Sequence, residues 1–322
     1  LRPDEPKFKL WHSAGLMLTY WCSSRCACCY VFSGPEAGHG KTEMSIDFAA
    51  ECWRELNRLA GPRAKIHLTG GEPFGNFDRL EQILQQGCEE NPGTLEKIET
   101  NAYWCVGENS TRDILGRLKA AGLTKLQIST DIYHQEYVPM ERVRLCARLA
   151  EEILGRENVQ IRWQDFFASP VLAGQMSEAE KRKMFRDTLQ KRGERLLGRA
   201  AVELAGLFPL RPYRDFAEIN CAKSMIASQH VHIDGGGHVF PGTCIGIIIS
   251  NLIVPKRLRL DELWRNFDYR QHRIMARLAE AGPCGLLDEA IKRGYRPLPG
   301  YAGKCHLCFD IRRFLYQTGD YG

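Results

Sequence analysis

Three cysteines near the start of the chain stand at a spacing that suits a metal centre. Cys22, Cys26 and Cys29 lie within residues 22–29, which read CSSRCACC. Three thiolates on one short loop can hold three corners of a 4Fe–4S cluster and leave the fourth iron open to a substrate or cofactor. A zinc knuckle or a set of buried thiols is the alternative interpretation of such a loop.

Four more cysteines that could share a site follow residue 220. Cys221 and Cys244 flank a predicted hairpin, and Cys305 and Cys308 form a C-x2-C pair. A hairpin and a helix that carry four thiolates could hold a fully ligated 4Fe–4S cluster or a structural zinc ion. The spacing of the cysteines is compatible with both. Cys284 is left over from this set.

Composition and charge narrow the class of protein. The 322 residues are 44% hydrophobic and 26% charged, which is ordinary for a globular chain of about two domains. The net charge of +5 is too small to argue for nucleic acid. No apolar run reaches the roughly 18–20 residues of a membrane span, and no secretory signal opens the chain, so we expect a cytoplasmic protein. Thirteen cysteines in a reducing compartment favour metal or redox chemistry over disulfides.

The cysteine loop follows the first of several strand-like runs that alternate with helix-like runs. Apolar runs predict strands at residues 16–21, 65–69, 95–100, 123–129 and 158–166. Helical periodicity and capping residues predict helices at 46–59, 78–87, 110–121, 139–154 and 177–192, and glycines predict a hairpin at 231–240. This order predicts an α/β fold with parallel strands, either a barrel or an open sheet. In both, ligands bind at the carboxyl ends of the strands.

A second motif, at the end of the second predicted strand, helps to identify the cysteine loop. Leu68-Thr69-Gly70-Gly71-Glu72-Pro73 ends that strand with two glycines, which allow a ligand to approach, and a carboxylate, which can accept from an ammonium group. A strand ending in C-x3-C-x2-C, a helix, and a strand ending in GGEP together resemble the radical S-adenosylmethionine (radical SAM) superfamily. The resemblance implies that the three loop cysteines ligate a 4Fe–4S cluster. It also implies that the methionyl amine of SAM is held by Gly70, Gly71 and Glu72.

Further SAM contacts are implied at the ends of the later strands. Thr100-Asn101 ends the third predicted strand, where the family often has Thr-Asn. Ser129-Thr130-Asp131 ends the fourth, where Ser-x-Asp is frequent, and Arg162 or Gln164 on the fifth is a candidate for the SAM carboxylate or ribose. In this family, SAM is cleaved reductively to a 5′-deoxyadenosyl radical, which takes a hydrogen atom from the substrate.

One position departs from the family pattern. The residue before the third cysteine is usually aromatic or His and packs near adenine, whereas Cys28 stands here, and Tyr30 could take part of that role. Gly198-Arg199-Ala200 resembles a Gly-Arg-Ala sequence found late in the barrel of many members.

The second cysteine set resembles the twitch domain, the shortened form of the SPASM extension of radical SAM enzymes. Residues 233–235 (IDG) and 241–244 (PGTC) are similar to its Asp-Gly…Pro-Cys signature. The resemblance implies one auxiliary 4Fe–4S cluster on Cys221, Cys244, Cys305 and Cys308. We therefore expect a partial (β/α)6 TIM-like barrel at residues 1–205, with an N-terminal extension at 1–14, and a small iron–sulfur extension of β-hairpin and helix at 206–322.

Candidate catalytic residues follow the fourth predicted strand, at the mouth of such a barrel. Tyr133, His134 and Glu136 could orient a substrate or move a proton, and an ordinary polar loop is the alternative. Cys284 is a candidate for returning a hydrogen atom to a carbon radical, which epimerisation requires, and a buried inert thiol is the alternative. His67 lies inside a strand and is interpreted as a core histidine.

The substrate that we expect first is a peptide or peptidyl side chain or Cα, ahead of a small metabolite. Oxidation, cross-linking, epimerisation and redox-neutral rearrangement are the competing outcomes, and an auxiliary cluster that accepts an electron suits oxidation. The resemblance implies a reductase partner such as flavodoxin or ferredoxin, and a separate peptide-recognition protein is compatible with it. Outside enzymes, the alternative is a zinc-stabilised binding module, which would be colourless and would not bind SAM.

Overall fold

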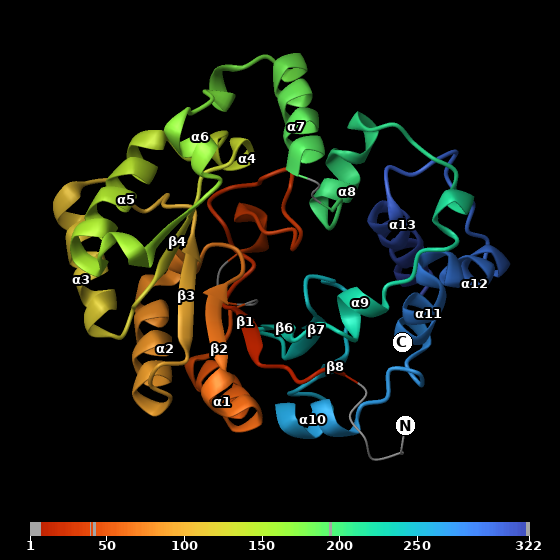
Figure 1. Ribbon diagram of the computed structural model, residues 1–322, viewed down its shortest axis with the longest axis horizontal. Coiled ribbons are helices and arrows are strands. Elements are labelled where there is room, and N and C mark those ends of the chain that lie inside the picture. Colours follow the sequence, from red (N-terminus) through yellow and green to blue (C-terminus); the bar gives the residue numbers. More distant parts are fainter. Residues whose placement is uncertain (1–7, 39, 41–42, 193–194, 320–322) are drawn as a thin grey trace.

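An eight-stranded sheet forms the frame of the molecule (Figure 1). The computed structural model describes residues 8–319 except 39, 41–42 and 193–194. Parallel strands follow one another in the order β5-β4-β3-β2-β1-β6, and β7 and β8 continue the sheet in antiparallel pairing. The strands are β1 (Ser13–Met17), β2 (Lys65–Thr69), β3 (Leu95–Thr100), β4 (Leu126–Ser129), β5 (Val159–Arg162), β6 (His230–Asp234), β7 (His238–Pro241) and β8 (Ser250–Asn251).

Four helices connect the first five strands and pack beside one another in chain order (Figure 1). They are α1 (Ile46–Ala60), α2 (Phe77–Glu90), α3 (Glu108–Ala120) and α5 (Met140–Leu154). Their apolar faces join the sheet in one buried core. In the described part of the chain, the further α-helices are α4 (Ile132–Gln135), α6 (Gln164–Ala168), α7 (Glu178–Arg192), α8 (Arg199–Glu203), α9 (Ala222–Met225), α10 (Leu260–Asn266), α11 (Arg273–Ala281), α12 (Leu287–Lys292) and α13 (Lys304–Gln317).

Helix α1 begins and packs as its sequence dictates. The hydroxyl of Ser45 accepts from the N–H of Phe48 at 3.2 Å, so Ser45 caps the N-terminus of the helix. Trp53 is fully buried, and a Cβ at Gly87 of α2 would lie 2.3 Å from its ring, so glycine allows the close approach. The Trp53 indole N–H donates to the Thr94 hydroxyl at 2.5 Å. These contacts fix α1 against α2 and the start of β3.

The α/β fold class is confirmed, but several boundaries differ from expectation. Strand β1 at Ser13–Met17 begins and ends earlier than the predicted residues 16–21. Helix α3 begins at Glu108, two residues before the predicted start, with Gly107 as its N-cap, and the Ser110 hydroxyl donates back to the Gly107 carbonyl at 3.0 Å. Strand β5 ends at Arg162, and residues 164–166, which were expected in the strand, belong to α6.

The sixth parallel strand comes from an unexpected part of the chain. It is β6, the first strand of the predicted hairpin, and it pairs with β1 with Leu16 opposite Ile233. Residues 178–192 between β5 and this hairpin are rich in charge and form α7, so they offer no apolar run for a strand beside β5. The hairpin therefore extends the same sheet, and the division of the chain at residues 205 and 206 stays a prediction.

The C-terminal helices pack on the same core as the sheet. Tyr301, Phe216 and Leu307 are fully buried and belong to the cluster that contains β1 and β2. The Tyr295 hydroxyl lies 2.6 Å from that of Tyr301 and donates to an oxygen of Asp310 at 2.6 Å. This network joins the segment before α13 to α13 itself.

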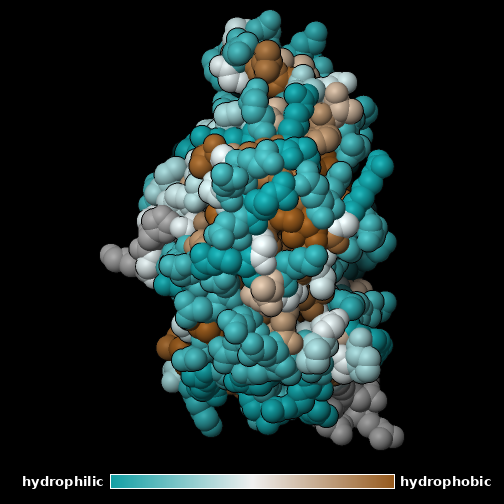
Figure 2. Space-filling model, turned by 90° about the vertical axis from the view of Figure 1, so that its left-hand side faces the viewer, coloured by the Kyte–Doolittle hydropathy of each residue, from teal (hydrophilic) through white to brown (hydrophobic). Residues whose placement is uncertain are grey.

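The outer helical face is mainly polar. Figure 2 shows mostly hydrophilic residues on the side that carries α3 and α5 in Figure 1, with smaller apolar patches between them. Among the described residues, no helix combines the length and the hydropathy needed to span a bilayer.

Candidate functional site

A cavity of about 830 Å³ lies at the carboxyl ends of the parallel strands. Every strand from β1 to β5 delivers predicted site residues to its wall, and β6 closes one side. The predicted residues that line it are Cys22, Cys26, Cys29, Tyr30, Gly70, Gly71, Glu72, Asn101, Ser129, Asp131, His134 and Arg162. Residues up to 140 positions apart thus meet at the edge where parallel sheets bind ligands.

The cysteine loop presents its thiols with hydrogen-bond donors already in place. The N–H of Ser24 donates to the Cys22 sulfur at 3.4 Å, and the N–H of Ser33 donates to the Cys29 sulfur at 3.3 Å. The amide of Asn101 lies 3.6 Å from the Cys22 sulfur. Hydrogen bonds to sulfur stabilise thiolate ligands in iron–sulfur sites, so this donor set fits a cluster.

Arg199 makes several hydrogen bonds to the same loop. Its backbone N–H donates to the Cys29 carbonyl at 2.8 Å, and its guanidinium donates to the carbonyls of Cys26 at 3.1 Å and Ser33 at 2.8 Å. Gly198 has φ of +54°, and a Cβ there would lie 2.3 Å from the Tyr30 carbonyl oxygen. The Gly-Arg-Ala sequence therefore lets α8 begin directly against the cysteine loop.

Burial keeps the thiols of Cys22 and Cys26 protonated when no metal is bound. It raises the pKa of Cys22 to about 12, and the nearby charge of Glu72 acts in the same direction. Burial also raises the pKa of Cys26 well above its ordinary value, while the positive charge of Arg199 opposes both shifts. Because thiolate is the form that ligates metal, binding of a metal centre here must release protons.

Gly70 and Gly71 bring the end of β2 against the start of the cysteine loop. The N–H of Gly71 donates to the Thr19 carbonyl at 2.7 Å. A Cβ at Gly70, where φ is +126°, would lie 2.5 Å from the Thr19 carbonyl oxygen, and one at Gly71 would lie 2.0 Å from that of Trp21. The sequence suggested close approach of a ligand, and the structure adds close approach of two backbones.

Glu72 ties the end of β2 to the end of β3. One carboxylate oxygen accepts from the Thr100 hydroxyl at 2.8 Å and from the N–H of Phe74 at 3.2 Å, and the other accepts from the N–H of Asn101 at 2.7 Å. Burial raises the pKa of Glu72 to about 7, although these hydrogen bonds oppose the shift. The Asn101 amide is thereby directed to the hydroxyls of Ser23 and Ser24, each at 3.2 Å.

Asp131 organises the turn after β4. Its carboxylate accepts from the N–H groups of Tyr133 and His134, and the His134 Nδ1 lies 2.8 Å from it. Burial would raise the pKa of Asp131, but His134 and then Arg162 hold it below its ordinary value. Two opposite charges, those of Asp131 and Arg162, therefore face one cavity from neighbouring strands.

Three predicted catalytic residues lie elsewhere than in the cavity wall. Tyr133 is buried, and its hydroxyl donates to the Phe185 carbonyl at 3.1 Å, which anchors α4 to α7. Glu136 pairs with Lys181 at 3.1 Å. The Cys284 thiol donates to the Tyr213 carbonyl at 3.4 Å among the C-terminal helices. Of the four predicted catalytic residues, the structure brings His134 to the cavity.

The second cysteine set is also brought together. Cys221 precedes α9, Cys244 follows β7, and Cys305 and Cys308 lie in the first turns of α13. Burial raises the pKa of Cys221 to about 11 and that of Cys305 to about 12, and neighbouring thiols of the set add to both shifts. The positive charge of Arg195 opposes both shifts and that of Lys304 opposes the shift of Cys221, so cations lie near the set.

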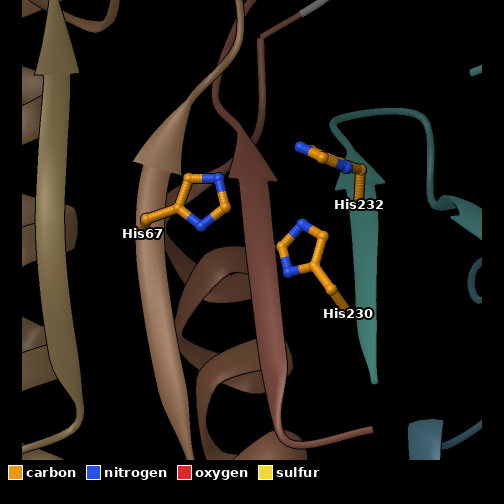
Figure 3. A group of neighbouring side chains, drawn as sticks. All are labelled: His67, His230 and His232. Atoms are coloured by element: carbon orange, nitrogen blue, oxygen red, sulfur yellow. The ribbon is translucent and has the colours of Figure 1, made fainter. Parts of the chain in front are cut away.

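Three histidines in the cavity wall were not predicted as site residues. His67 on β2 and His230 and His232 on β6 direct their rings toward one another across β1 (Figure 3). The His-x-His spacing is a signal that could have found two of them, because alternate residues of a strand face the same side. The interpretation of His67 as a core histidine does not account for its place in a cavity.

Known proteins resemble this chain in sequence and in fold. Residues 16–155 match the model of the Radical SAM superfamily. The crystal structure of BtrN in complex with AdoMet and 2-DOIA has a TM-score of 0.53 and 14% identity, and the match covers 86% of this chain and 90% of that one. Native anSMEcpe with bound AdoMet and Cp18Cys peptide has a TM-score of 0.48 and 12% identity, and the match covers 95% of this chain and 96% of that one. Streptococcus suis SuiB bound to S-adenosylmethionine has a TM-score of 0.34 and 11% identity, and the match covers 80% of this chain and 66% of that one. No curated protein matches the sequence.

The matched family segment contains the cysteine loop, the Gly-Gly-Glu-Pro turn and the ends of β3 and β4. The family model supports SAM cleavage by radical chemistry, and with it SAM and one 4Fe–4S cluster as cofactors. The likeness to BtrN shows the fold. Residues 16–155 are therefore a radical SAM domain, as the resemblance predicted.

Proposed function

We propose that this protein is a radical SAM oxidoreductase or maturase that abstracts a hydrogen atom from a peptide or peptidyl side chain or Cα. Oxidation, cross-linking and epimerisation are the outcomes this would serve. The observation that carries the proposal is that the cysteine loop and the polar side chains at the strand ends line one cavity.

We assign the first cluster to Cys22, Cys26 and Cys29. When bound, the reduced 4Fe–4S cluster and SAM supply a 5′-deoxyadenosyl radical that takes a hydrogen atom from the substrate. Arg199 and the N–H groups of Ser24 and Ser33 fix the loop and stabilise its thiolates.

We assign the SAM contacts to the remaining wall. Glu72 accepts three hydrogen bonds from protein groups, and a carboxylate has about four lone-pair sites, so one site is left for the methionyl amine beside Gly70 and Gly71. Arg162 supplies a cation for the SAM carboxylate, and Asp131 supplies an acceptor for hydroxyl groups. The other proposed contacts are Tyr30, Asn101 and Ser129.

The size of the cavity favours a substrate that enters through one group. Ligand pockets measure about 300–1,000 Å³, so a cavity of about 830 Å³ has room for SAM and a further side chain but not for a folded segment of chain. A peptide would insert the reacting residue and leave its flanks outside. His134, held by Asp131, is proposed to orient that residue.

We assign an auxiliary 4Fe–4S cluster to Cys221, Cys244, Cys305 and Cys308. Zinc in a tetrahedral site with Zn–S of about 2.3 Å places sulfurs about 3.8 Å apart. Among the described residues, the ligand atoms of His, Cys, Asp and Glu that gather in threes within 4.8 Å are histidine nitrogens, not cysteine sulfurs. The wider spacing of both cysteine sets favours clusters over single zinc ions.

The first experiment tests cleavage of SAM. Anaerobically reconstituted protein is given SAM with flavodoxin or ferredoxin and its reductase, and 5′-deoxyadenosine is measured beside a variant with Cys22→Ala, Cys26→Ala and Cys29→Ala. We expect the product with the wild-type protein alone. Equal 5′-deoxyadenosine from both proteins, or none from either, contradicts the proposal.

A small polar metabolite is the second candidate, and the charged and imidazole groups in the cavity wall favour it. Extract from cells grown in deuterated medium is separated into a peptide-and-protein fraction and a small-molecule fraction. Transfer of deuterium to 5′-deoxyadenosine identifies the fraction that holds the substrate. Label from the small-molecule fraction alone would replace the peptide proposal with this one. A second protein needed for peptide recognition would be supplied by the larger fraction.

A further inference from the structure

We propose that His67, His230 and His232 bind one divalent transition-metal ion at the wall of the cavity and leave a coordination position open toward its interior. This centre would be separate from both cysteine sets. It would bind an oxygen donor of the substrate.

The three side chains are already gathered for one ion. One ring nitrogen from each lies within 4.8 Å of the other two. Nitrogens at about 2.0–2.1 Å from a tetrahedral zinc stand about 3.3 Å apart, so closure onto an ion requires movements of about 1.5 Å at most, which ring rotations supply. Figure 3 shows the rings pointing toward one another from two strands that flank β1.

Backbone register creates the space between the rings. Gly15 of β1 stands opposite His67 on one side and His232 on the other. A Cβ at Gly15 would lie 2.6 Å from atoms of each of these two rings. The missing side chain therefore opens the volume into which the imidazoles project, and any other residue at this position would fill it.

Two of the rings have partners that orient them as ligands. The Nδ1 of His232 lies 2.6 Å from the Gly242 carbonyl, which can only accept, so Nδ1 carries the proton and Nε2 presents its lone pair. The Nδ1 of His230 lies 2.9 Å from the Ser13 hydroxyl. Metal-binding histidines are commonly held in this way through the nitrogen that does not bind the metal. The Tyr30 hydroxyl lies 3.4 Å from the His232 Nε2, next to the position of the ion.

The surroundings keep the imidazoles neutral, which is the form that binds metal. Burial lowers the pKa of His67 to about 4 and that of His230 to about 2, and it also lowers the pKa of His232. The Glu99 carboxylate acts on His67 and His232 and would favour a cation there. Lys97 pairs with Glu99 at 3.2 Å and moderates that charge without adding a ligand.

The ligand set selects the class of metal and its use. Three neutral imidazoles suit Zn²⁺, Co²⁺, Ni²⁺ and Cu²⁺. Three protein ligands with an open position are typical of zinc sites that bind substrate or water, whereas structural sites are closed by a fourth protein ligand. Since all three rings line the cavity, a carboxylate, carbonyl or hydroxyl of the substrate would complete the coordination. This last step rests on the proposed function, whereas metal binding does not.

The test uses reconstituted holoprotein that is cleared of loose metal with a chelator and then equilibrated with one equivalent of Zn²⁺. Metal content and zinc K-edge absorption are measured on the wild-type protein and on His67→Gln and His232→Gln variants. We expect one zinc per chain with nitrogen or oxygen neighbours at about 2.0–2.1 Å in the wild type, and loss of that zinc in both variants. His238→Ala changes a histidine of the same hairpin outside the cluster and is expected to keep it.

Three results would overturn the proposal. They are no bound zinc in the wild type, zinc with sulfur at about 2.3 Å, which places it on cysteines, and zinc retained in both histidine variants. If circular dichroism shows that a variant is unfolded, its zinc content is not used. The atoms that coordinate zinc in the wild type then decide whether the proposal holds. Iron content and SAM cleavage on the same samples test the proposed function separately, so either idea can fail without the other.

Discussion

Arg199 and Cys29 are joined by a backbone hydrogen bond of 2.8 Å, although strands β2 to β5 and their connecting helices lie between them in the chain. The guanidinium of the same arginine, which is 2% exposed, donates to two more carbonyls of the cysteine loop. A buried cation with several fixed acceptors positions a loop more firmly than an exposed one, because its hydrogen bonds do not compete with water.

We expect Arg199→Lys to weaken the first cluster site. A lysine carries the charge but cannot donate to the Cys26 and Ser33 carbonyls in the same fork geometry. Hydrogen bonds to charged groups contribute about 1.5–3 kcal/mol each, so loss of one should lower the melting temperature and the iron retained on dilution. Iron per chain, measured during anaerobic gel filtration, checks this.

Arg25→Lys is the matched control for that variant. Arg25 lies on the same loop, but it is half exposed and pairs with Glu203 at 2.8 Å. Exposed pairs contribute about 0–1 kcal/mol, so this variant should retain iron like the wild type. Equal iron retention by the Arg199 and Arg25 variants would contradict the role that we give to Arg199.

The pH dependence of stability should report on Glu72. Burial raises its pKa to about 7 from an ordinary value of 4.5, so the folded state keeps a proton that the unfolded state loses within that interval. Its contribution to stability therefore falls as the pH rises from about 4.5 to 7 and is constant above 7. At about 1.4 kcal/mol per pKa unit, the change is about 3.5 kcal/mol at most.

Glu72→Gln removes this titration while keeping the size of the side chain. We expect the free energy of unfolding of the variant, relative to the wild type, to rise between pH 5 and pH 8. Denaturant unfolding of the metal-free proteins at both pH values measures the difference. A difference that stays the same at both values would show that the carboxyl does not titrate in that range.

Iron counting should separate the two cysteine sets. Two 4Fe–4S clusters give about eight iron per chain, and replacing Cys221, Cys244, Cys305 and Cys308 by alanine should leave about four. SAM binding should survive this change, because the first cluster site is assembled from other elements. A wild-type value near four, or zinc in place of iron, would remove the auxiliary cluster.

The sequence was sufficient to predict where β2, β3 and β4 end, because apolar runs follow local rules. Cys22 and Glu72 sit directly after apolar runs, and parallel strands bring such positions to one edge. The place of β6 beside β1 was not predicted, since pairing between distant strands depends on complementary surfaces that no local pattern records. For the same reason the partnership of His67 with His232 remained hidden until the register was known.

The catalytic candidates after β4 illustrate another limit. Residues 131–136 form one short turn, and the sequence cannot say which side chains of such a turn face inward. Asp131 caps the turn and draws His134 to the cavity, while the Tyr133 hydroxyl finds a buried carbonyl on α7. These choices follow from the packing of α7, which lies far along the chain.

Gly15 offers a direct test of the space around the histidines. We expect Gly15→Ala to lower the free energy of unfolding by about 1–3 kcal/mol, as overpacking of a core does, because its Cβ would meet the rings of His67 and His232. Gly116→Ala is the control, since Gly116 is exposed on α3 with nothing within 4 Å of the added carbon. Alanine should stabilise that helix by up to about 1 kcal/mol. Thermal unfolding of both variants checks the pair, and equal stability of the two would mean that the rings do not occupy the space over β1.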